Sequence, residues 1–326
     1  MSTEMITFSD AICRAIEEEM DKDPTVFTYG EDIAEQGGIF GQYKGLLNKH
    51  QDKVIDTPIS EEVIYGSAVG AALAGARPIV EFHFSDFLFT GMSAITNQIM
   101  KIRYMSGGQR DLPIILRGPD GRSNSAAAQH SQSIETIFMH VPGIKVVIPS
   151  TPADVYGLYK YALNQKDPVI FFEHKQLYGI KGEVSTDEYE IEFGKADIKR
   201  EGDDITVITT GRMVHESLKA AQNLEKEGIS LEVIDLRTLV PWDRETVINS
   251  IKKTGRMMTV HETWRRAGWG AEVAAYVQEE AFDYLDAPIL RVGAKNVPNS
   301  FSPDQENYIM PDALNVVAEA KKFDLY

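Results

Sequence analysis

The segment that decides the fold is VIDTPISEEVIYGSAVGAALAGARPIVEF, residues 54–82. It begins with the short apolar run Val54–Asp56, continues through a Gly- and Ala-rich stretch over Glu62–Ala76, and ends with the apolar run Pro78–Phe82. Short apolar runs bounded by Gly, Pro or Asp are typical of buried strands, and the stretch between them is long enough for a helix. A strand, a helix and a second strand in this order predict a crossover unit, and therefore a parallel sheet with helices on both faces.

The same alternation extends in both directions from this segment. Four more strands are expected, at Val26–Tyr29, Pro113–Arg117, Ile144–Ile148 and Val169–Glu173. Further helices are expected at Phe87–Tyr104, at Ala153–Leu163 and after Thr7. Thr7 and Asp10 stand at capping-box spacing, and the apolar residues that follow them repeat at helical intervals. The first part of the chain therefore predicts one α/β domain.

A second domain is expected after a break in this pattern. Residues 174–203 are polar and acidic with little periodicity, and we interpret them as a connection that carries a short strand or two. The alternation then resumes with strands at Ile205–Thr209, Leu231–Ile234, Met257–His261 and Ile289–Val292, and helices at Val214–Lys226, Arg244–Lys253, Glu272–Phe282 and Asp312–Lys322. The sequence thus predicts an α/β protein of two doubly wound domains, residues 1–185 and 204–326, joined by a linker at 186–203.

Composition excludes several classes of protein. The 326 residues carry a formal net charge of -16, which argues against binding to a phosphate backbone. This charge can serve solubility or the docking of a basic partner. No 18-residue apolar run is present, so we expect no membrane partner. The start of the chain has no features of a signal or transit peptide, and Cys13 is the only cysteine, so we expect a cytoplasmic protein.

Most short catalytic motifs are absent. The sequence has no Gly-x-Gly-x-x-Gly after its first strand, no Walker-type Gly-Lys-Ser/Thr and no Gly-x-Ser-x-Gly elbow. Its seven histidines show no metal-ligand spacing. A doubly wound fold hosts many activities, so the function has to be inferred from specific residues.

Three longer motifs occur in one order along the chain. They are DTPISE at residues 56–61, RYMSGG at 103–108, and AAAQHSQS at 126–133 followed by VPGIKVV at 141–147. In order and spacing they resemble the E1 β subunits of pyruvate, branched-chain 2-oxo acid and acetoin dehydrogenase complexes. The similarity runs from about Ile6 to the C-terminus and includes Gly30–Asp32, Phe171–Lys175 and Asp235–Thr238.

This resemblance implies a fold and an activity. The first domain is expected to be a transketolase-like pyrimidine-binding domain, and the second a transketolase C-terminal-like domain. The expected enzyme is a thiamine-diphosphate-dependent oxidoreductase component that cleaves pyruvate or acetoin and transfers the acetyl group to lipoyl-E2. The residues around His130 resemble pyruvate and acetoin enzymes more than branched-chain ones, which often carry Tyr before the His. A branched-chain E1 β subunit, a transketolase or deoxyxylulose-phosphate-synthase fragment, a flavin or nucleotide module and a non-catalytic pairing subunit stay as alternatives.

Glu61 is the first candidate catalytic residue. Thiamine diphosphate requires one acidic side chain in a dry pocket, where desolvation raises its pKa and lets it share a proton with the aminopyrimidine ring. Glu61 follows the end of a strand, where open α/β sheets place their sites, and matches the family's activating Glu. A Glu that only complements a helix N-terminus would look the same in the sequence, and the neighbouring Glu62 is expected to have that role.

Three other residues are implied by the resemblance. Phe87 corresponds to an aromatic residue that packs on the aminopyrimidine, although Phe84 and Phe89 compete for this role and each of them suits a hydrophobic core. Glu31, in the Gly30–Asp32 motif, is expected to contact the cofactor. His130 corresponds to a histidine that handles protons during transfer to lipoyl-lysine. Histidine as a residue type titrates near neutral pH, which suits this role, but a loop histidine bonded to backbone is the alternative.

The resemblance also implies metals and partners. Some relatives hold potassium with backbone carbonyls, which here correspond to four residues: Ile114, Ala162, Gln165 and Asp167. An acidic side chain is common at the position of Gln165, but carbonyl ligation does not depend on the side chain. The Gly-Asp-Gly…Asn pattern that binds Mg²⁺ and diphosphate is absent, since Gly118–Gly121 is the nearest match. A separate E1 α subunit is therefore expected to hold Mg²⁺, in an α2β2 heterotetramer docked on lipoyl-bearing E2.

Overall fold

The computed structural model describes residues 2–325, which form two compact units. The first unit comprises the chain up to Asp120 together with Ile137–Phe193. The second comprises Gly121–Thr136 and the chain from Gly194 onward. The chain thus enters the second unit early, for sixteen residues that include His130, before it completes the first. Within the described residues, no helix has the length and apolar character needed to cross a membrane.

The first unit is built on a parallel sheet. Its strands lie in the order β6 (Lys145–Val147), β7 (Val169–His174), β5 (Ile115–Asp120), β4 (Arg77–Glu81), β2 (Val26–Gly30) and β3 (Val54–Asp56). A short antiparallel pair, β1 (Thr3–Thr7) and β8 (Lys181–Ser185), stands apart from this sheet. The six strands predicted for this domain are all present, with ends that differ by up to three residues.

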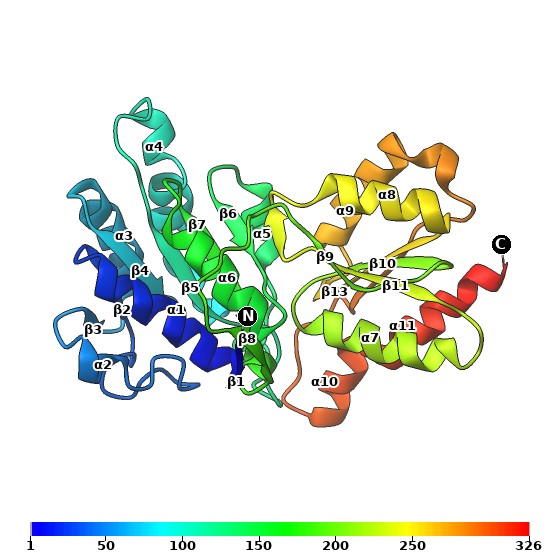
Figure 1. The fold of residues 1–326 in the computed structure, drawn as a ribbon, viewed down its shortest axis with the longest axis horizontal. Helices are drawn as coiled ribbons and strands as arrows, with labels where there is room; N and C mark the ends of the chain where they lie inside the picture. Colours follow the sequence, from blue (N-terminus) through cyan, green and yellow to red (C-terminus); the bar gives the residue numbers. More distant parts are fainter. Residues whose placement is uncertain (1, 326) are drawn as a thin grey trace. The chain divides into compact units, whose positions relative to one another are not determined.

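Helices cover this sheet as the crossover pattern predicts (Figure 1). They include α1 (Phe8–Lys22), α3 (Glu61–Leu73) and α6 (Pro152–Leu163). Thr7 caps α1, and the Thr7 and Asp10 side chains form the expected reciprocal capping box. The apolar stripe of α1, which includes Ile12 and Ile16, is buried in the core with α6. The α1 prediction is therefore confirmed together with its physical cause.

The helix predicted at Phe87–Tyr104 is wrong as a single element. The structure has a 3₁₀ turn at Ser85–Phe89, a π-helix at Ala94–Ile99 and the short α4 at Ile102–Met105. Gly91 lies between the first two, where an added Cβ would come within 2.2 Å of the Tyr65 ring on α3. Close packing of this segment against α3 sets its path, and hydrophobic periodicity does not report such long-range packing.

The second unit has its own sheet. Its strands lie in the order β14 (Leu290–Ala294), β13 (Met257–Trp264), β10 (Ile205–Thr209), β11 (Leu231–Asp235) and β9 (Asp197–Arg200). Four strands are parallel, and the edge strand β9 is antiparallel to β11. β9 lies within the stretch predicted as the 186–203 linker, so the last part of that stretch belongs to this sheet.

Helices cover both faces of the second sheet (Figure 1). α7 (Arg212–Glu225) and α11 (Ala313–Ala320) lie on one side, and α8 (Arg244–Thr254) and α9 (Trp269–Glu280) on the other. The short helix α10 (Pro303–Ile309), which the sequence did not reveal, precedes α11. Both sheets have the doubly wound α/β character that was predicted.

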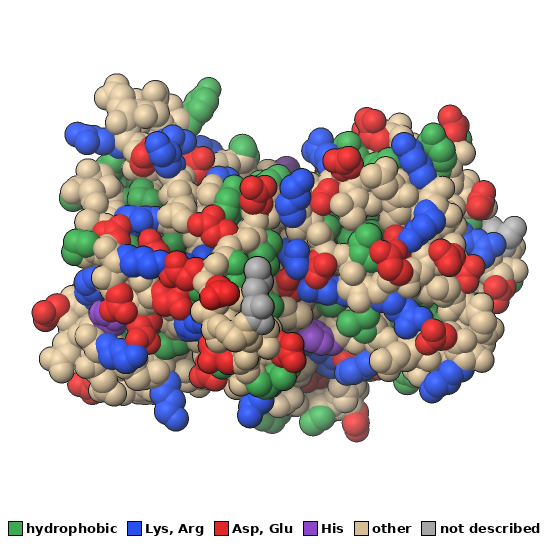
Figure 2. Space-filling view, viewed as in Figure 1, with side chains coloured by type: hydrophobic (Ala, Val, Ile, Leu, Met, Phe, Trp, Pro, Cys, Tyr) green, Lys and Arg blue, Asp and Glu red, His purple; other side chains and the backbone are tan. Residues whose placement is uncertain are grey.

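The surface carries charges of both signs. Figure 2 shows Lys and Arg side chains interspersed with Asp and Glu on the face in view. On α1 and its surroundings the charges are paired, as between Lys22 and Glu188. Such exposed pairs contribute little to stability, so the fold depends on its two apolar cores.

Candidate functional site

Three carboxylates follow or end neighbouring strands of the first sheet. Glu31 follows β2, Glu61 begins α3 after β3, and Glu81 ends β4. The three strands are adjacent and parallel, in the order β3-β2-β4. Their carboxyl ends therefore meet at one edge of the sheet, which is where open α/β sheets bind ligands. The structure thus places Glu31 and Glu61, both predicted from the sequence, at the same edge.

Local backbone contacts hold this edge together. The Thr57 amide donates to the Gly30 carbonyl at 2.9 Å, which ties the chain leaving β3 to the end of β2. Gly30 has no side chain, and an added Cβ would come within 2.5 Å of the Glu81 Cβ. Glycine at this position therefore permits the close approach of Glu81. The motifs at residues 30–32 and 56–61 accordingly meet in space.

The carboxylates influence one another electrostatically. Burial raises the pKa of Glu31; His83 opposes that increase, and the charge on Glu61 adds to it. The protonated form of Glu31 is therefore favoured more than that of an exposed Glu. Among the residues that the structure describes, the buried Tyr65 hydroxyl has no hydrogen-bond partner. Burial, followed by the charges of Glu61, Glu31 and Glu81, raises its pKa well above the ordinary value.

Aromatic rings form one wall beside these carboxylates. The His83 and Phe87 rings stack with centroids 6.2 Å apart and planes 8° apart. Phe84 meets Phe87 edge to face at 5.5 Å. Phe87 is half-buried, whereas 45% of Phe89 is exposed. Of the three predicted competitors, Phe87 and Phe84 therefore belong to one aromatic cluster, and that cluster includes His83, whose charge acts on Glu31.

A fully buried ionic network joins the strands next to the candidate site. The Arg117 guanidinium on β5 pairs with Glu81 on β4 and with Glu173 on β7. Tyr43 donates to Glu81 at 3.0 Å, and Tyr178 donates to Glu173 at 2.8 Å. Burial raises the pKa of Glu81, while Arg117 opposes that increase. This network fixes the end of β4, from which the aromatic cluster continues.

His130 lies in a different unit from Glu61, Glu31 and Phe87. It is half-buried in the Gly121–Thr136 segment, which is grouped with the second sheet. Its sequence neighbours adopt unusual conformations, with positive φ at Asn124, Ser125 and Ala127. Its predicted role in proton transfer stays a prediction.

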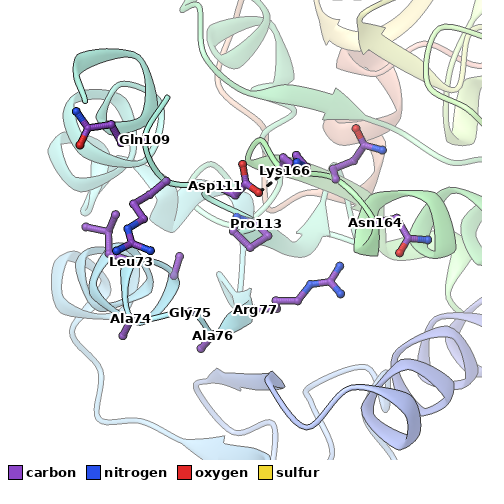
Figure 3. Close-up of a pocket in the computed structure, with 13 residues that line it drawn as sticks. Leu73, Ala74, Gly75, Ala76, Arg77, Gln109, Asp111, Pro113, Asn164 and Lys166 are labelled. Atoms are coloured by element: carbon purple, nitrogen blue, oxygen red, sulfur yellow. Dashed lines mark ion pairs between the residues drawn. The ribbon is translucent and has the colours of Figure 1, made fainter. Parts of the chain in front are cut away.

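A pocket of about 670 Å³ lies elsewhere in the first unit (Figure 3). It is lined by the end of α3 and the chain that leads into β4, by Gln109–Asp111 and Pro113, and by the turn after α6. Figure 3 shows Arg77, Asp111 and Lys166 among the lining residues, with an ion pair between Lys166 and Asp111. Arg77 begins β4 and Glu81 ends it, so this pocket lies at the opposite ends of the strands from the carboxylates. It is therefore separate from the candidate site.

The predicted potassium ligands are the backbone carbonyls of Ile114, Ala162, Gln165 and Asp167. The first two carbonyls already accept backbone amides, from Val169 at 2.9 Å and from Gln165 at 3.0 Å. The Gln165 side chain accepts from Lys145 Nζ at 2.7 Å, and Asp167 pairs with Arg103. A carbonyl oxygen has two lone pairs, so one accepted amide leaves room for a further contact. Potassium binding at this turn therefore stays a prediction.

Several residues of the site were not predicted from the sequence. Tyr65 follows Glu61 by four residues on α3, a spacing that places the two side chains on one helix face and that serves as a usable signal. His83 was assigned no role, because its positive φ of 50° and its stacking on Phe87 depend on the folded chain. Glu81 and Arg117 looked like ordinary strand residues, and no local pattern marks their pairing.

The residues present fit the aminopyrimidine part of thiamine diphosphate. Three polar groups suit a nitrogen-rich ring: the half-buried Glu61 carboxylate, the Glu31 carboxyl with its raised pKa, and the buried Tyr65 hydroxyl, which has no hydrogen-bond partner within residues 2–325. The half-buried ring of Phe87 supplies an apolar surface on which such a ring can pack.

Comparisons with known proteins agree with this geometry. Residues 4–181 match the transketolase pyrimidine-binding domain family, and residues 194–316 match the transketolase C-terminal domain family. In structure, the chain is similar to a split-gene transketolase described as an inactive β4 tetramer. The TM-score is 0.80, with 24% identity over 97% of both chains. At that identity, the likeness shows the fold.

Curated relatives are similar over nearly the whole chain. The β subunit of acetoin:2,6-dichlorophenolindophenol oxidoreductase of Cupriavidus necator is 45% identical, covering 96% of this chain and 95% of the relative. The 2-oxoisovalerate dehydrogenase β subunit of Bacillus subtilis is 44% identical, covering 98% of both. The pyruvate dehydrogenase E1 β subunit of the same organism is 44% identical, covering 97% of this chain and 98% of the relative. The chain therefore belongs to the transketolase-like family of E1 β subunits of 2-oxo acid and acetoin dehydrogenases, whose enzymes use thiamine diphosphate.

Proposed function

We propose that this chain supplies the aminopyrimidine half of a thiamine-diphosphate site in an E1 enzyme that cleaves pyruvate or acetoin and passes the acetyl group to lipoyl-E2. The observation that carries the proposal is the meeting of Glu31, Glu61 and the Phe87 cluster at the carboxyl edge of β3-β2-β4. This edge lies within the part of the chain that matches a pyrimidine-binding family.

Each residue has a separate task in this proposal. When bound, thiamine diphosphate supplies the electron sink for cleavage of the bond next to the substrate's carbonyl. The Glu61 carboxyl shares a proton with a ring nitrogen, and Glu31 donates or accepts a second hydrogen bond. The ring of Phe87 packs against the flat heterocycle and excludes water from one face. His130 delivers a proton to the lipoyl sulfur during acetyl transfer.

We further propose that an E1 α subunit completes the site. Glu61 is only half-buried in this chain, whereas a proton-sharing carboxylate works best where water is excluded. The sequence also lacks the Gly-Asp-Gly…Asn pattern for Mg²⁺ and diphosphate. An α chain that covers the edge would supply both missing parts, in an α2β2 assembly bound to E2 in the cytoplasm.

The residues around His130 favour pyruvate or acetoin as the substrate, whereas the overall sequence identity to relatives does not distinguish between substrates. Relatives named for acetoin, 2-oxoisovalerate and pyruvate are 45%, 44% and 44% identical, so identity alone does not choose among them. Branched-chain oxo acid cleavage is the second candidate, and a non-catalytic pairing role is the third. A panel of pyruvate, acetoin and 2-oxoisovalerate with the co-expressed α and β chains separates all three.

The decisive test is Glu61→Gln, with Glu62→Gln as its matched control. A neutral amide cannot share the proton, and lost acid–base roles typically cost about 10² to 10⁴ in rate. Reduction of 2,6-dichlorophenolindophenol by the co-expressed enzyme is the measurement, with assembly checked by sedimentation. The adjacent Glu62 is exposed, and its substitution is expected to leave the rate within about twofold, as for a surface change outside the site. A Glu61→Gln enzyme that assembles normally and keeps more than about a tenth of the rate would contradict the assignment, since that loss lies below the expected range.

A further inference from the structure

The segment that carries His130 is held within the second unit by hydrogen bonds to residues far along the chain. These hydrogen bonds join Arg122 N to Glu262, Ser125 N to Glu306, Ser131 O to Asn299, Ser133 O to Thr263, and Thr136 Oγ1 to Trp269 N. They are spread from one end of the Gly121–Thr136 segment to the other. The sequence separations, up to 185 residues for the Arg122–Asn307 contact, show that this is tertiary and not local structure.

The first half of the segment is conformationally strained. Asn124, Ser125 and Ala127 have φ values of 42°, 70° and 65°, in a region that residues with a side chain seldom occupy. Residues in this region are strained and persist only where surrounding contacts hold them. Ala127 has no polar side chain that could stabilise this conformation locally. The contacts with the second unit must therefore hold the segment in this shape.

Glu306 is the contact placed at the strained residues. Both of its carboxylate oxygens accept the Ser125 amide, at 3.2 and 3.1 Å. Only 4% of Glu306 is exposed, and within residues 2–325 its carboxylate accepts hydrogen bonds from this amide alone. A buried carboxylate needs hydrogen-bond partners. Its position on α10 thus couples that helix to the backbone five residues before His130.

Glu262 on β13 holds the entry to the same segment. It accepts the Arg122 amide at 2.8 Å and pairs with Arg212 of α7 at 3.2 Å. Thr263, the next residue of β13, donates to the Ser133 carbonyl at 2.8 Å. The backbone is therefore fixed on both sides of His130 by β13, and Glu306 fixes the strained stretch between Arg122 and His130.

We propose that Glu306 is a positioning residue for the step that uses His130. It acts through the Ser125 backbone, and the inference rests on the proposed role of His130 in acetyl transfer. The second unit then determines the orientation of His130, and this role is additional to any contacts that the unit makes with other subunits. Loss of the Glu306 carboxylate lets the segment relax from its positive-φ conformation and moves His130 away from its working position.

The activity test uses Glu306→Ala and Glu306→Gln in the co-expressed α and β enzyme. Acetyl transfer is followed as NADH formation by the reconstituted complex. In Glu306→Ala, we expect its rate to fall by about tenfold more than the rate of dye reduction, which is within the range of rate losses for an acid catalyst. Glu306→Gln keeps one oxygen acceptor for Ser125 and is expected to restore most of the transfer rate. Glu319→Ala removes a carboxylate of α11 that pairs with Lys322 and is the matched control. Equal losses in both assays for Glu306→Ala would overturn the proposal.

Amide hydrogen exchange of residues 121–136 tests, independently of activity, whether Glu306 holds this segment in place. Glu306→Ala is expected to raise exchange in this segment, while the strands of both sheets keep their protection. Unchanged exchange in the segment would overturn the proposal. So would raised exchange without any loss of transfer. His130→Ala, measured in parallel, tests the proposed function itself. If this variant transfers acetyl groups at the wild-type rate, the role of His130 fails even where the fastening by Glu306 is shown.

Discussion

At the scale of single residues, environment separates side chains that look alike in the sequence. Glu61 and Glu62 are adjacent acids at the start of α3, but Glu61 is half-buried beside Glu31 and Tyr65 while Glu62 is exposed. Histidines differ in the same way. His83 joins an aromatic cluster at the candidate site, whereas His261 is enclosed in the second unit with 1% of its surface exposed.

His261 gives a prediction for the pH dependence of stability. Burial, together with smaller effects of the Arg291 and Arg265 charges, lowers the pKa of His261 to about 4, and the hydrogen bond with the Thr263 carbonyl opposes that decrease. Gly268, Gly270 and Gly293 pack so closely that an added Cβ on any of them would lie within 3 Å of the imidazole. Because the folded pKa is below the unfolded one, the neutral ring stabilises the fold above about pH 6.5, and this contribution of about 3 kcal/mol is lost as pH falls toward 4.

Urea unfolding between pH 7 and pH 4 checks this prediction. His261→Gln carries no titratable group, so its free energy of unfolding should depend less steeply on pH over this window than that of the wild type. His140→Gln, a substitution at an exposed histidine of α5 (Glu135–His140), is the control and should retain the wild-type slope. Identical slopes for His261→Gln and the wild type would show that His261 contributes nothing to acid sensitivity.

At the scale of elements, the central strands of the first unit are joined by charge as well as by their hydrogen-bond ladder. Arg117 on β5 lies between Glu81 on β4 and Glu173 on β7, and all three side chains are essentially inaccessible to solvent. Such a network is costly to desolvate, so its members depend strongly on one another. The network holds the end of β4 in place, and the aromatic cluster of the candidate site follows directly from that end.

Arg117→Met is expected to destabilise the fold by about 3–5 kcal/mol, because it leaves two buried carboxylates without their cation. Guanidinium unfolding measures the loss. Arg110→Met is the control, because Arg110 is exposed and has no hydrogen-bond or ion-pair partner among residues 2–325. Combining Arg117→Met with Glu81→Gln and Glu173→Gln should recover part of the stability, since no unpaired charge then stays buried. A single Arg117→Met variant as stable as the wild type would contradict the role assigned to the network.

At the scale of the whole molecule, two doubly wound units divide the proposed tasks. The first unit carries the carboxylate edge that would bind the aminopyrimidine, and the second carries the His130 segment. Neither the sequence motifs nor the carboxylate edge accounts for the Mg²⁺ and diphosphate half of the cofactor site. An E1 enzyme built on this chain therefore requires a second kind of subunit.

The isolated chain is accordingly expected to bind thiamine diphosphate poorly and to show no dye-linked activity. Calorimetry with Mg²⁺ and thiamine diphosphate, on the chain alone and with its α partner, is the measurement. Sedimentation of the mixture should give the mass of an α2β2 assembly. Binding by the isolated chain with a dissociation constant near 1 μM, about -8 kcal/mol, would contradict the division of the site between two subunits.

Much of this protein was determined by local sequence alone. The capping box at Thr7 and Asp10 specifies the start of α1, because a cap needs only residues within one helical turn. Short apolar runs between Gly, Pro and Asp located the strands of both sheets, since a strand buried on both faces requires apolar residues throughout. The position of Glu61 after β3 also placed it at the carboxyl edge. Crossover connections keep the strands parallel, so the carboxyl ends of all the strands lie at one edge of the sheet.

Tertiary structure decided what depends on residues far apart in the chain. Arg122 and Glu262 are separated by 140 residues, so no sequence window reveals that the His130 segment belongs with the second unit. The π-helix at Ala94–Ile99 and the buried pairing of Arg117 with Glu173 likewise depend on packing against distant elements. Sequence patterns report which face of an element is apolar, whereas the partner that covers that face, and the conformation it imposes, exist only once the chain has folded.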